Sequence, residues 1–178
     1  MSAEKALAAT LRPYLPSDAA LCAAIFRAAV EELTADDYDE DGRAAWASSG
    51  DDVAAFNARL ENAVTLVAIY GGGPVGFGSL KGDVIDMLFV APAVAGRGVG
   101  ATLLDALIKL ARARGVKKLT SEVSDTARPT FERQGFSAER RNMVRVGGEW
   151  LANTTMVKTL ADASAPSRRE TSTGRAPT

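Results

Sequence analysis

The chain has 178 residues, of which 47% are hydrophobic, and its 21 basic and 22 acidic side chains leave a net charge of −1. This length fits a single domain with its own core, and the balanced charge argues against a protein that binds nucleic acid through a basic surface. The absence of histidine excludes Ser-His-Asp triads and His-ligated metal sites. The single cysteine, Cys22, excludes an internal disulfide and a Cys-rich metal cluster, so we expect no bound metal.

The ends of the chain give no sign of export or of membrane insertion. The N-terminal MSAEKALAATLRPY has no apolar stretch of signal-peptide length, and no apolar run approaches the length of a membrane span. With one cysteine, these features predict a cytoplasmic protein. We expect one domain over residues 1–160 and a disordered tail over residues 161–178, which are rich in Ser, Thr, Pro and Arg.

The first third of the chain has mostly helical periodicity. Apolar residues recur at intervals of three and four after Ser17-Asp18, which resembles a helix N-cap. Trp46 lies on the apolar side of a second, weaker pattern. The predicted elements are a short strand over 10–13, a helix over 18–33, a helix over 40–48 and an ambiguous, partly helical segment over 51–62.

The rest of the chain alternates between strands and helices. Gly-rich turns separate apolar runs and indicate antiparallel hairpins. The predicted strands are 64–70, 75–80, 83–90, 116–123, 136–146 and 149–158, and the predicted helices are 97–114 and 126–134. Because a long helix connects 83–90 to 116–123, these two strands are expected to be parallel neighbours.

The loop before the long helix carries the clearest chemical pattern. Glycines at 96, 98 and 100 remove Cβ atoms where a ligand could approach the backbone, and the free N–H groups of a helix N-terminus favour an anion. The loop therefore predicts a phosphate cradle, most simply for a pyrophosphate; the alternative is a Gly-rich loop that is merely flexible. A P-loop is excluded because its lysine is missing. A Rossmann fold is kept as an alternative because Glu122 lies about 20 residues further on, near the end of the next strand, where that fold has an acidic residue. The glycine spacing differs from that of a Rossmann loop, however, and only one strand–helix–strand unit is present.

Two segments resemble the GNAT superfamily of N-acetyltransferases over roughly residues 10–160. Val90-x-Pro92 followed by Gly96-Arg97-Gly98-Val99-Gly100 is similar to the acyl-CoA signature of that family. The segment from Ala127 through Phe131 to Gly135-Phe136 resembles its final helix and the exit from it. The opening Leu11-Arg12-Pro13-Tyr14 and the ending Trp150-x-x-Asn153-x-x-Met156 resemble its uncharacterised, bacterial YafP-like branch.

The resemblance implies a GNAT-like α/β fold. We expect a mixed, mostly antiparallel sheet of six or seven strands, with helices on both faces and a parallel pair that splays to admit the cofactor. It also implies acetyl-CoA as the co-substrate. Backbone groups near Leu88, Phe89 and Val90 are expected to hold the acetyl carbonyl, and the remaining expected contacts to the cofactor are Gly96, Arg97, Gly98, Val99, Gly100, Ala101 and Ser124.

The chain departs from the family pattern at two positions. Ala95 stands where the family usually has Arg or Gln, so a polar side chain near the pyrophosphate is missing. Phe131 stands where many members have the tyrosine that protonates the departing thiolate, and a phenyl ring cannot donate a proton. The thiol is a fair leaving group without a strong acid, because its pKa is about 8.5, and water could substitute for the tyrosine.

The attacking amine needs a base, and without histidine the base is Asp, Glu or water. We expect Asp86 to fill this role, since strand alternation puts it on one face with Val84, Leu88 and Val90. The alternative for Asp86 is a structural ion pair with an arginine. Glu122, on the neighbouring parallel strand, is the second candidate for the base.

The resemblance implies direct transfer to a primary amine, carried by a small molecule or a peptide. Tyr38 and Trp46 are candidates for the acceptor pocket, and the acidic run 36–41 could attract a cationic acceptor, although both features are also typical of ordinary packing and solvated surface. Neither nucleic acid nor a membrane is expected as a partner, and a homodimer stays an option. The competing function is a non-catalytic CoA-binding or interaction module of the same fold.

Overall fold

The computed structural model describes residues 7–161, so almost all of the tail predicted over 161–178 lies outside the described residues. The strands are β1 Thr10–Pro13, β2 Val64–Tyr70, β3 Gly73–Lys81, β4 Val84–Val90, β5 Lys118–Ser124, β6 Ser137–Val146 and β7 Glu149–Thr159. The helices are α1 Ala19–Ala28, α2 Glu40–Ser48, α3 Val53–Glu61, α4 Val99–Ala113 and α5 Arg128–Arg133. These elements confirm the predicted α/β class.

The seven strands form one sheet in the order β1-β2-β3-β4-β5-β7-β6. All neighbours are antiparallel except β4 and β5, which are parallel as predicted. The registered parallel pairing is confined to Val84 and Thr120, and it is supported by the Thr120 N–H, which donates to Asp83 O at 3.0 Å. Beyond this point β4 and β5 separate, which opens the sheet at its centre.

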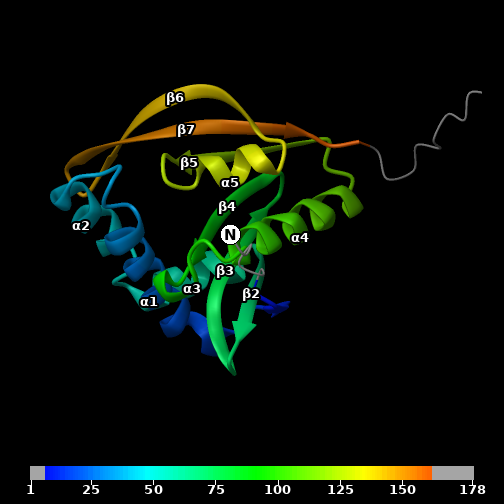
Figure 1. Cartoon of the computed structure of the whole chain (residues 1–178), viewed down its shortest axis with the longest axis horizontal. Helices are drawn as coiled ribbons and strands as arrows, with labels where there is room; N and C mark the ends of the chain where they lie inside the picture. The colour runs from blue at the N-terminus through cyan, green and yellow to red at the C-terminus, as the bar shows by residue number, and fades with distance from the viewer. Residues whose placement is uncertain (1–6, 162–178) are drawn as a thin grey trace, which may run out of the picture.

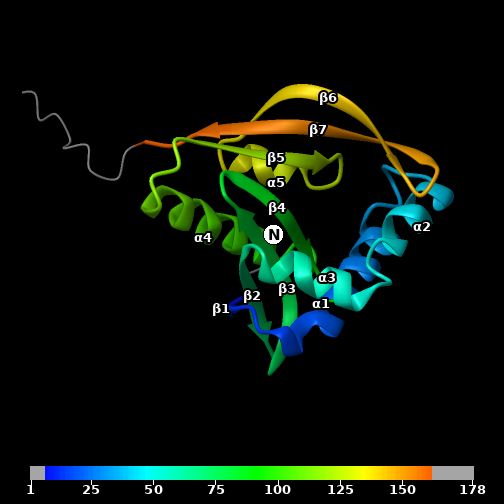
Figure 2. The ribbon, with the colours of Figure 1, turned by 180° about the vertical axis from the view of Figure 1, so that it is seen from behind.

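Helices cover both faces of the sheet, and each face has its own core. On the face of α1 and α3 the core includes Phe26, Phe56, Phe77 and Met87. On the face of α4 and α5 it includes residues such as Leu104 and Phe131. Figures 1 and 2 show α1–α3 and α4 on opposite sides of the central strands, with β6 and β7 arching across the top of the molecule. The sheet separates the two cores. The opening between β4 and β5 therefore lies between two separately packed groups of buried side chains.

The predicted helix periodicities are confirmed, with two changes of detail. The helix expected over 18–33 is α-helical to Ala28 and ends in a π-helical turn over Ala29–Leu33. The ambiguous segment 51–62 contains the full helix α3, which buries Phe56 and Leu60 on one side. Its start is fixed by the Asp52 carboxylate, which accepts from the Ala55 N–H at 3.0 Å.

Asp18 is the N-cap residue of α1, at the predicted place, but its side chain does not cap this helix. Asp18 has helical backbone angles and makes no side-chain bond to the first turn of α1. Its carboxylate instead accepts two hydrogen bonds from Arg12, at 2.7 and 2.8 Å, and one from the Leu15 N–H at 2.9 Å. Arg12 lies on β1, so this buried carboxylate ties the first strand to the start of the first helix.

A β-bulge changes the face on which Asp86 lies. Ser79 of β3 faces Met87 and the next residue, Leu80, faces Ile85, so Asp86 has no partner across the ladder. An extra residue in one strand resets the alternation of side chains. Asp86 therefore points to the α3 side, like Met87, and the prediction that it shares a face with Leu88 and Val90 is wrong.

Candidate active site

The glycine loop leads directly into the N-terminus of α4. The Thr102 N–H makes the first helical bond, to Gly98 O at 3.0 Å, so the N–H groups of Gly100 and Ala101 precede the helical ladder. Among the described residues, neither of these two N–H groups has a backbone acceptor. Together with the positive end of the helix dipole, they make an anion-binding position at the predicted place.

The three loop glycines play different roles. Gly96 and Gly98 have φ of 72° and 83°, in the left-handed region that side chains disfavour. Gly100 is helical, and a Cβ added there would meet only the Val90 side chain, at 3.7 Å. The protein itself therefore leaves room at Gly100. Nearby, the buried Nε of Arg97 has no hydrogen-bond partner among the described residues, which adds an unused donor beside the loop.

β4 presents free backbone N–H groups at the opening of the sheet. The Ala91 N–H donates to Val75 O at 2.8 Å, so it points toward β3. Hydrogen-bonding groups alternate between the two edges of an antiparallel strand. The N–H of Phe89 consequently also points toward β3, whereas those of Leu88 and Val90 point toward the edge that β5 has left. Of the three residues predicted to hold a carbonyl through the backbone, Leu88 and Val90 have the right orientation, and Phe89 contributes its ring to a cavity instead.

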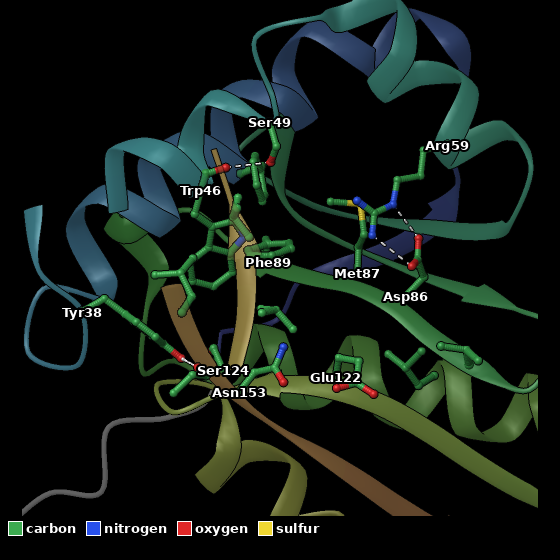
Figure 3. A pocket seen from close by; sticks show the side chains of 17 residues that line it. Tyr38, Trp46, Ser49, Arg59, Asp86, Met87, Phe89, Glu122, Ser124 and Asn153 are labelled. Atoms are coloured by element: carbon green, nitrogen blue, oxygen red, sulfur yellow. Dashed lines mark hydrogen bonds and ion pairs between the residues drawn. The ribbon is translucent and has the colours of Figure 1, made fainter. Parts of the chain in front are cut away.

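A cavity of about 280 Å³ lies on the α1–α3 side of this opening. Figure 3 shows Trp46, Phe89 and Met87 along one wall, Glu122 and Asn153 along another, and the Arg59–Asp86 pair at one end. Apolar residues of the β6–β7 hairpin complete the lining. Three helices, α1 to α3, and four strands, β4 to β7, thus contribute to one cavity.

A second cavity, of about 60 Å³, lies in the gap between β4 and β5. Ser124 lines both cavities, and its hydroxyl accepts from the Ala127 N–H at 3.2 Å while donating to no group among the described residues. Phe131, at the predicted position of the missing tyrosine, lines the smaller cavity. It is buried and packs edge-on against Phe136. The Ser124 hydroxyl therefore has a proton that no described residue accepts. It shares the smaller cavity with Phe131, whose ring has no proton to donate.

Asp86 forms the ion pair that the sequence left open as its alternative role. Arg59 of α3 donates to both of its oxygens, at 2.8 and 3.0 Å, and this hydrogen bonding to Asp86 raises the pKa of Arg59. The pair lines the larger cavity, and its two charges neutralise each other. Because Asp86 is already paired with a cation, it is a weaker partner for a proton or an ammonium group than a carboxylate without a cation.

Glu122 has neutral partners only. Its two oxygens accept from Asn142 Nδ2 and from Thr155 Oγ1, each at 2.8 Å. These donors on β6 and β7 fix the carboxylate without neutralising it, and each oxygen keeps a second lone pair. Glu122 is exposed to solvent in the larger cavity, so a positively charged group can reach it.

Tyr38 spans from the helical side to the sheet. Its hydroxyl donates to Ala152 O at 2.6 Å and accepts from the Asp125 N–H at 3.0 Å. Burial raises the pKa of Tyr38 above its ordinary value, so the phenol stays neutral. In Figure 3 Tyr38 extends past the cavity toward Ser124. Both Tyr38 and Trp46 line the cavity, as the sequence suggested, and Trp46 packs on Phe26 and Phe89 as well.

Sequence reasoning missed several cavity residues. Arg59 lay in the ambiguous segment, so its partner could not be assigned. Asn142 and Thr155 meet Glu122 only because β6 and β7 fold beside β5. In 141–146, Val144 and Val146 alternate with the exposed Met143 and Arg145. This alternation could have predicted that one face of the hairpin is apolar and lines the cavity.

Comparisons with known proteins agree on one family. A family model described as an acetyltransferase (GNAT) domain matches residues 34–160. The chain is 37% identical over 146 residues to the uncharacterized N-acetyltransferase YafP of Escherichia coli K12, a match that covers 82% of this chain and 93% of that protein. A crystal structure from Rhodopseudomonas palustris, described as a GCN5-related N-acetyltransferase (aminotransferase, class-II), is 56% identical with a TM-score of 0.86 and covers 89% of this chain and 100% of that one.

More distant structures share the fold. PaiA N-acetyltransferase of Thermoplasma acidophilum, solved with coenzyme A, is 17% identical with a TM-score of 0.71, covering 86% of this chain and all of that one. YncA of Salmonella typhimurium, a putative acetyltransferase solved with acetyl-CoA, is 24% identical with a TM-score of 0.63, covering 91% and 99%. In residues 7–161 no helix is long and apolar enough to span a membrane, and no three metal-ligating side chains cluster.

Proposed function

The chain belongs to the GNAT family of acetyltransferases, and we propose that it transfers the acetyl group of acetyl-CoA to a primary amine by direct attack in a ternary complex. One observation carries this proposal: the opening between β4 and β5 joins an anion-binding helix N-terminus to a cavity of about 280 Å³. A cofactor threaded through the opening would reach both. The free thiol of the single cysteine, Cys22, further supports the cytoplasm as the compartment.

The loop residues fit a pyrophosphate. In this proposal Gly96, Gly98 and Gly100 keep the backbone accessible, and the N–H groups at the start of α4, from Val99 to Ala101, bind the phosphate oxygens. Arg97 lies in the same loop, and among the described residues its buried Nε has no hydrogen-bond partner. The backbone donors do most of the binding in this proposal, so the missing side chain at Ala95 lowers affinity only modestly. At the other end of the cofactor, the N–H groups of Leu88 and Val90 bind the acetyl oxygen and the negative charge that develops on it.

Glu122 is the base in this proposal. It accepts the proton of the attacking ammonium group, because it faces the cavity with lone pairs that no cation occupies. Asp86 then acts by holding Arg59 at the cavity end. General base catalysis of this kind contributes about 10²–10⁴-fold to a rate.

Ser124 takes over part of the role of the absent tyrosine. Its hydroxyl donates a hydrogen bond to the departing sulfur, which would otherwise have only Phe131 beside it. A hydroxyl is too weak an acid to transfer its proton fully to a thiolate whose conjugate acid has a pKa of about 8.5, so the sulfur leaves as a hydrogen-bonded thiolate and takes up its proton from solvent after it has left. Ser124 thus contacts the cofactor in this proposal, in line with the expectation from the sequence.

Measuring release of the CoA thiol from acetyl-CoA across a panel of primary amines tests the proposal. We expect amine-dependent release, with the acetylated amine identified by mass spectrometry. The buried phenyl ring of Phe131 favours one competing function, a module that binds CoA without catalysis. Tight CoA binding in a calorimetric titration, without turnover of any amine, would establish that alternative.

A further inference from the structure

The lining of the larger cavity constrains what the acceptor can be. One wall is aromatic: the rings of Phe26 and Phe89 lie edge-on with centroids 4.8 Å apart, and Trp46 lies edge-on to Phe89 at 6.2 Å. The facing hairpin adds the side chains of Val144 and Val146. Two apolar walls favour a substrate whose body is apolar and about the size of a ring.

The charges of the cavity add a second constraint. Its charged lining residues are Arg59, Asp86 and Glu122. Arg59 and Asp86 neutralise each other at 2.8 Å, whereas Glu122 is held by neutral donors. The cavity therefore has one unbalanced negative charge. A single ammonium group matches it, a substrate carboxylate would be repelled, and a second ammonium group would have no partner there.

The ends of the cavity add a third constraint, on length. Tyr38 joins the helical side to Ala152 and Asp125 through its hydroxyl. Next to it, Thr126 Oγ1 donates to Asp37 at 2.6 Å, which adds a second link between the same two segments. The Arg59–Asp86 pair lies at another end (Figure 3). Between these ends the cavity has a volume of about 280 Å³, which suits a compact molecule better than an extended peptide.

We propose that the acceptor is a compact primary amine with one positive charge and an apolar, ring-sized body, of the arylalkylamine type. The ammonium group binds at Glu122, and the ring lies between the Trp46–Phe89 wall and the β6–β7 hairpin. This inference rests on the proposed acetyl transfer, since the same cavity is its acceptor site. In the reaction the ammonium proton passes to Glu122 and the amine nitrogen forms a bond to the acetyl carbon. The bond from that carbon to sulfur then breaks, the second proton on nitrogen is lost to solvent, and the departing sulfur takes up a proton from solvent.

A matched set of amines tests the inference. The probes are 2-phenylethylamine, phenylalanine, which adds a carboxylate to it, spermidine, which adds charge, and an alanine-initiated tripeptide. We expect kcat/KM for 2-phenylethylamine to exceed that for each other probe by at least about 100-fold, a difference of about 2.8 kcal/mol. An equal or higher value for any of the other three overturns this inference and leaves acetyl transfer intact.

Variants on the two faces of β6 test where the ring binds. Val146→Phe fills the cavity, and we expect it to raise KM for the amine 2-phenylethylamine at least about 10-fold while KM for acetyl-CoA stays unchanged. Met143→Phe is the matched control, because Met143 on the same strand is 59% exposed and does not line the cavity. Equal effects of the two substitutions would overturn the placement.

Binding can be followed separately from turnover. The chain has two tryptophans, and Trp150 is 62% exposed, so Trp150→Phe leaves the cavity residue Trp46 as the reporter. We expect 2-phenylethylamine to change Trp46 fluorescence in the CoA-loaded protein and phenylalanine not to. Binding without acetylation of any amine supports this inference and overturns the proposed function, whereas neither binding nor acetylation overturns both.

Discussion

The two sides of the opening between β4 and β5 are built from different parts of the polypeptide. On the side proposed for the cofactor the available groups belong to the backbone: the start of α4, the loop glycines and the outward N–H groups of β4. On the side proposed for the acceptor they are side chains of α1, α2, α3, β4, β5 and the β6–β7 hairpin. A backbone site needs one continuous segment, whereas a side-chain site needs distant segments to meet.

Because of this difference, the two sites tolerate different kinds of substitution. A backbone cradle tolerates exchange of most side chains but not the addition of a Cβ where the ligand approaches. A side-chain cavity changes its preference with each substitution. One scaffold can therefore keep its cofactor while its acceptor changes, and substitutions on the two sides should affect different kinetic constants.

The largest effect is expected from charge in the cradle. Gly98→Asp places a carboxylate where the pyrophosphate approaches, and we expect acetyl-CoA affinity to fall by at least about 1,000-fold, or about 4 kcal/mol, in a calorimetric titration. Gly98→Asn is the control of equal shape. Gly98 has φ of 83°, and Asp and Asn tolerate that conformation better than other side chains, so both variants should fold.

Gly100 gives the steric counterpart of this test. The protein leaves space for a Cβ at Gly100, so Gly100→Ala should keep its stability and lose affinity only through contact with the ligand. Gly100→Glu adds charge at the same position and should abolish binding. Unchanged affinity in both Gly98→Asp and Gly100→Glu would contradict the phosphate cradle.

The second largest effect is expected at the acceptor carboxylates. Glu122→Gln keeps the shape of the side chain and removes the base, so we expect kcat to fall about 100- to 1,000-fold with KM for acetyl-CoA unchanged. The loss should shrink toward high pH, because a growing fraction of the amine is then already deprotonated. Steady-state rates between about pH 6 and about pH 10 measure this.

Asp86→Asn is the comparison variant for the base. It breaks the pair with Arg59 but leaves Glu122 in place, so we expect a smaller fall in kcat and a higher KM for the amine. If Asp86→Asn stops turnover and Glu122→Gln stays active, the base is Asp86, which was the first choice from the sequence.

The cofactor side could be predicted from the sequence because its information is local. Glycine spacing, the helix period after it and the strand before it specify the loop without any distant partner. The parallel pairing of β4 with β5 followed from the single long connection through α4. Ser124 and Phe131 were singled out by the family resemblance instead, and both line the small cavity between β4 and β5.

The acceptor side could not be predicted to the same extent. The bulge that turns Asp86 toward Arg59 depends on the register between β3 and β4, which alternation along one strand cannot reveal. The donors that hold Glu122 come from β6 and β7, and β7 lies between β5 and β6 although β6 precedes it in the chain. Likewise, Asp18 bonds to Arg12 on another element rather than to its own helix.

The Arg12–Asp18 pair joins β1 to the start of α1, which lines the larger cavity. Breaking this pair tests whether a change in α1 affects the acceptor cavity without affecting the cofactor side. Asp18→Asn should lower the free energy of unfolding by about 2 kcal/mol, since it leaves the partly exposed Arg12 without its charged partner. If the two sides are independent, KM for the amine should rise and acetyl-CoA affinity should not change. Chemical denaturation and calorimetry measure the two effects.

The same pair gives a pH dependence with a defined sign. The hydrogen bonds from Arg12 lower the pKa of Asp18 below its usual value of about 3.9. A carboxyl whose pKa is lower in the folded state stabilises the fold above its unfolded pKa, and this stabilisation is lost as the pH falls toward the folded value. The wild type should therefore lose more stability than Asp18→Asn between about pH 4 and about pH 2. Parallel acid unfolding curves would contradict the role of the pair.

The smallest effect is expected at Ser124, where the two sides of the opening meet. Among the described residues its hydroxyl accepts from the Ala127 N–H and donates to no group, so Ser124→Ala removes this acceptor together with the proposed hydrogen bond to the departing sulfur, and we expect kcat to fall about 5-fold. The effect should not depend on pH between about 6 and about 10, because the serine hydroxyl keeps its proton over this range. Ser124→Thr keeps a hydroxyl and should keep the rate. Adding Phe131→Tyr to Ser124→Ala should restore the rate, because Phe131 lines the same small cavity and a phenol can supply the missing proton. A loss that the phenol does not repair would make Ser124 a packing residue and would leave only water to stabilise the departing sulfur.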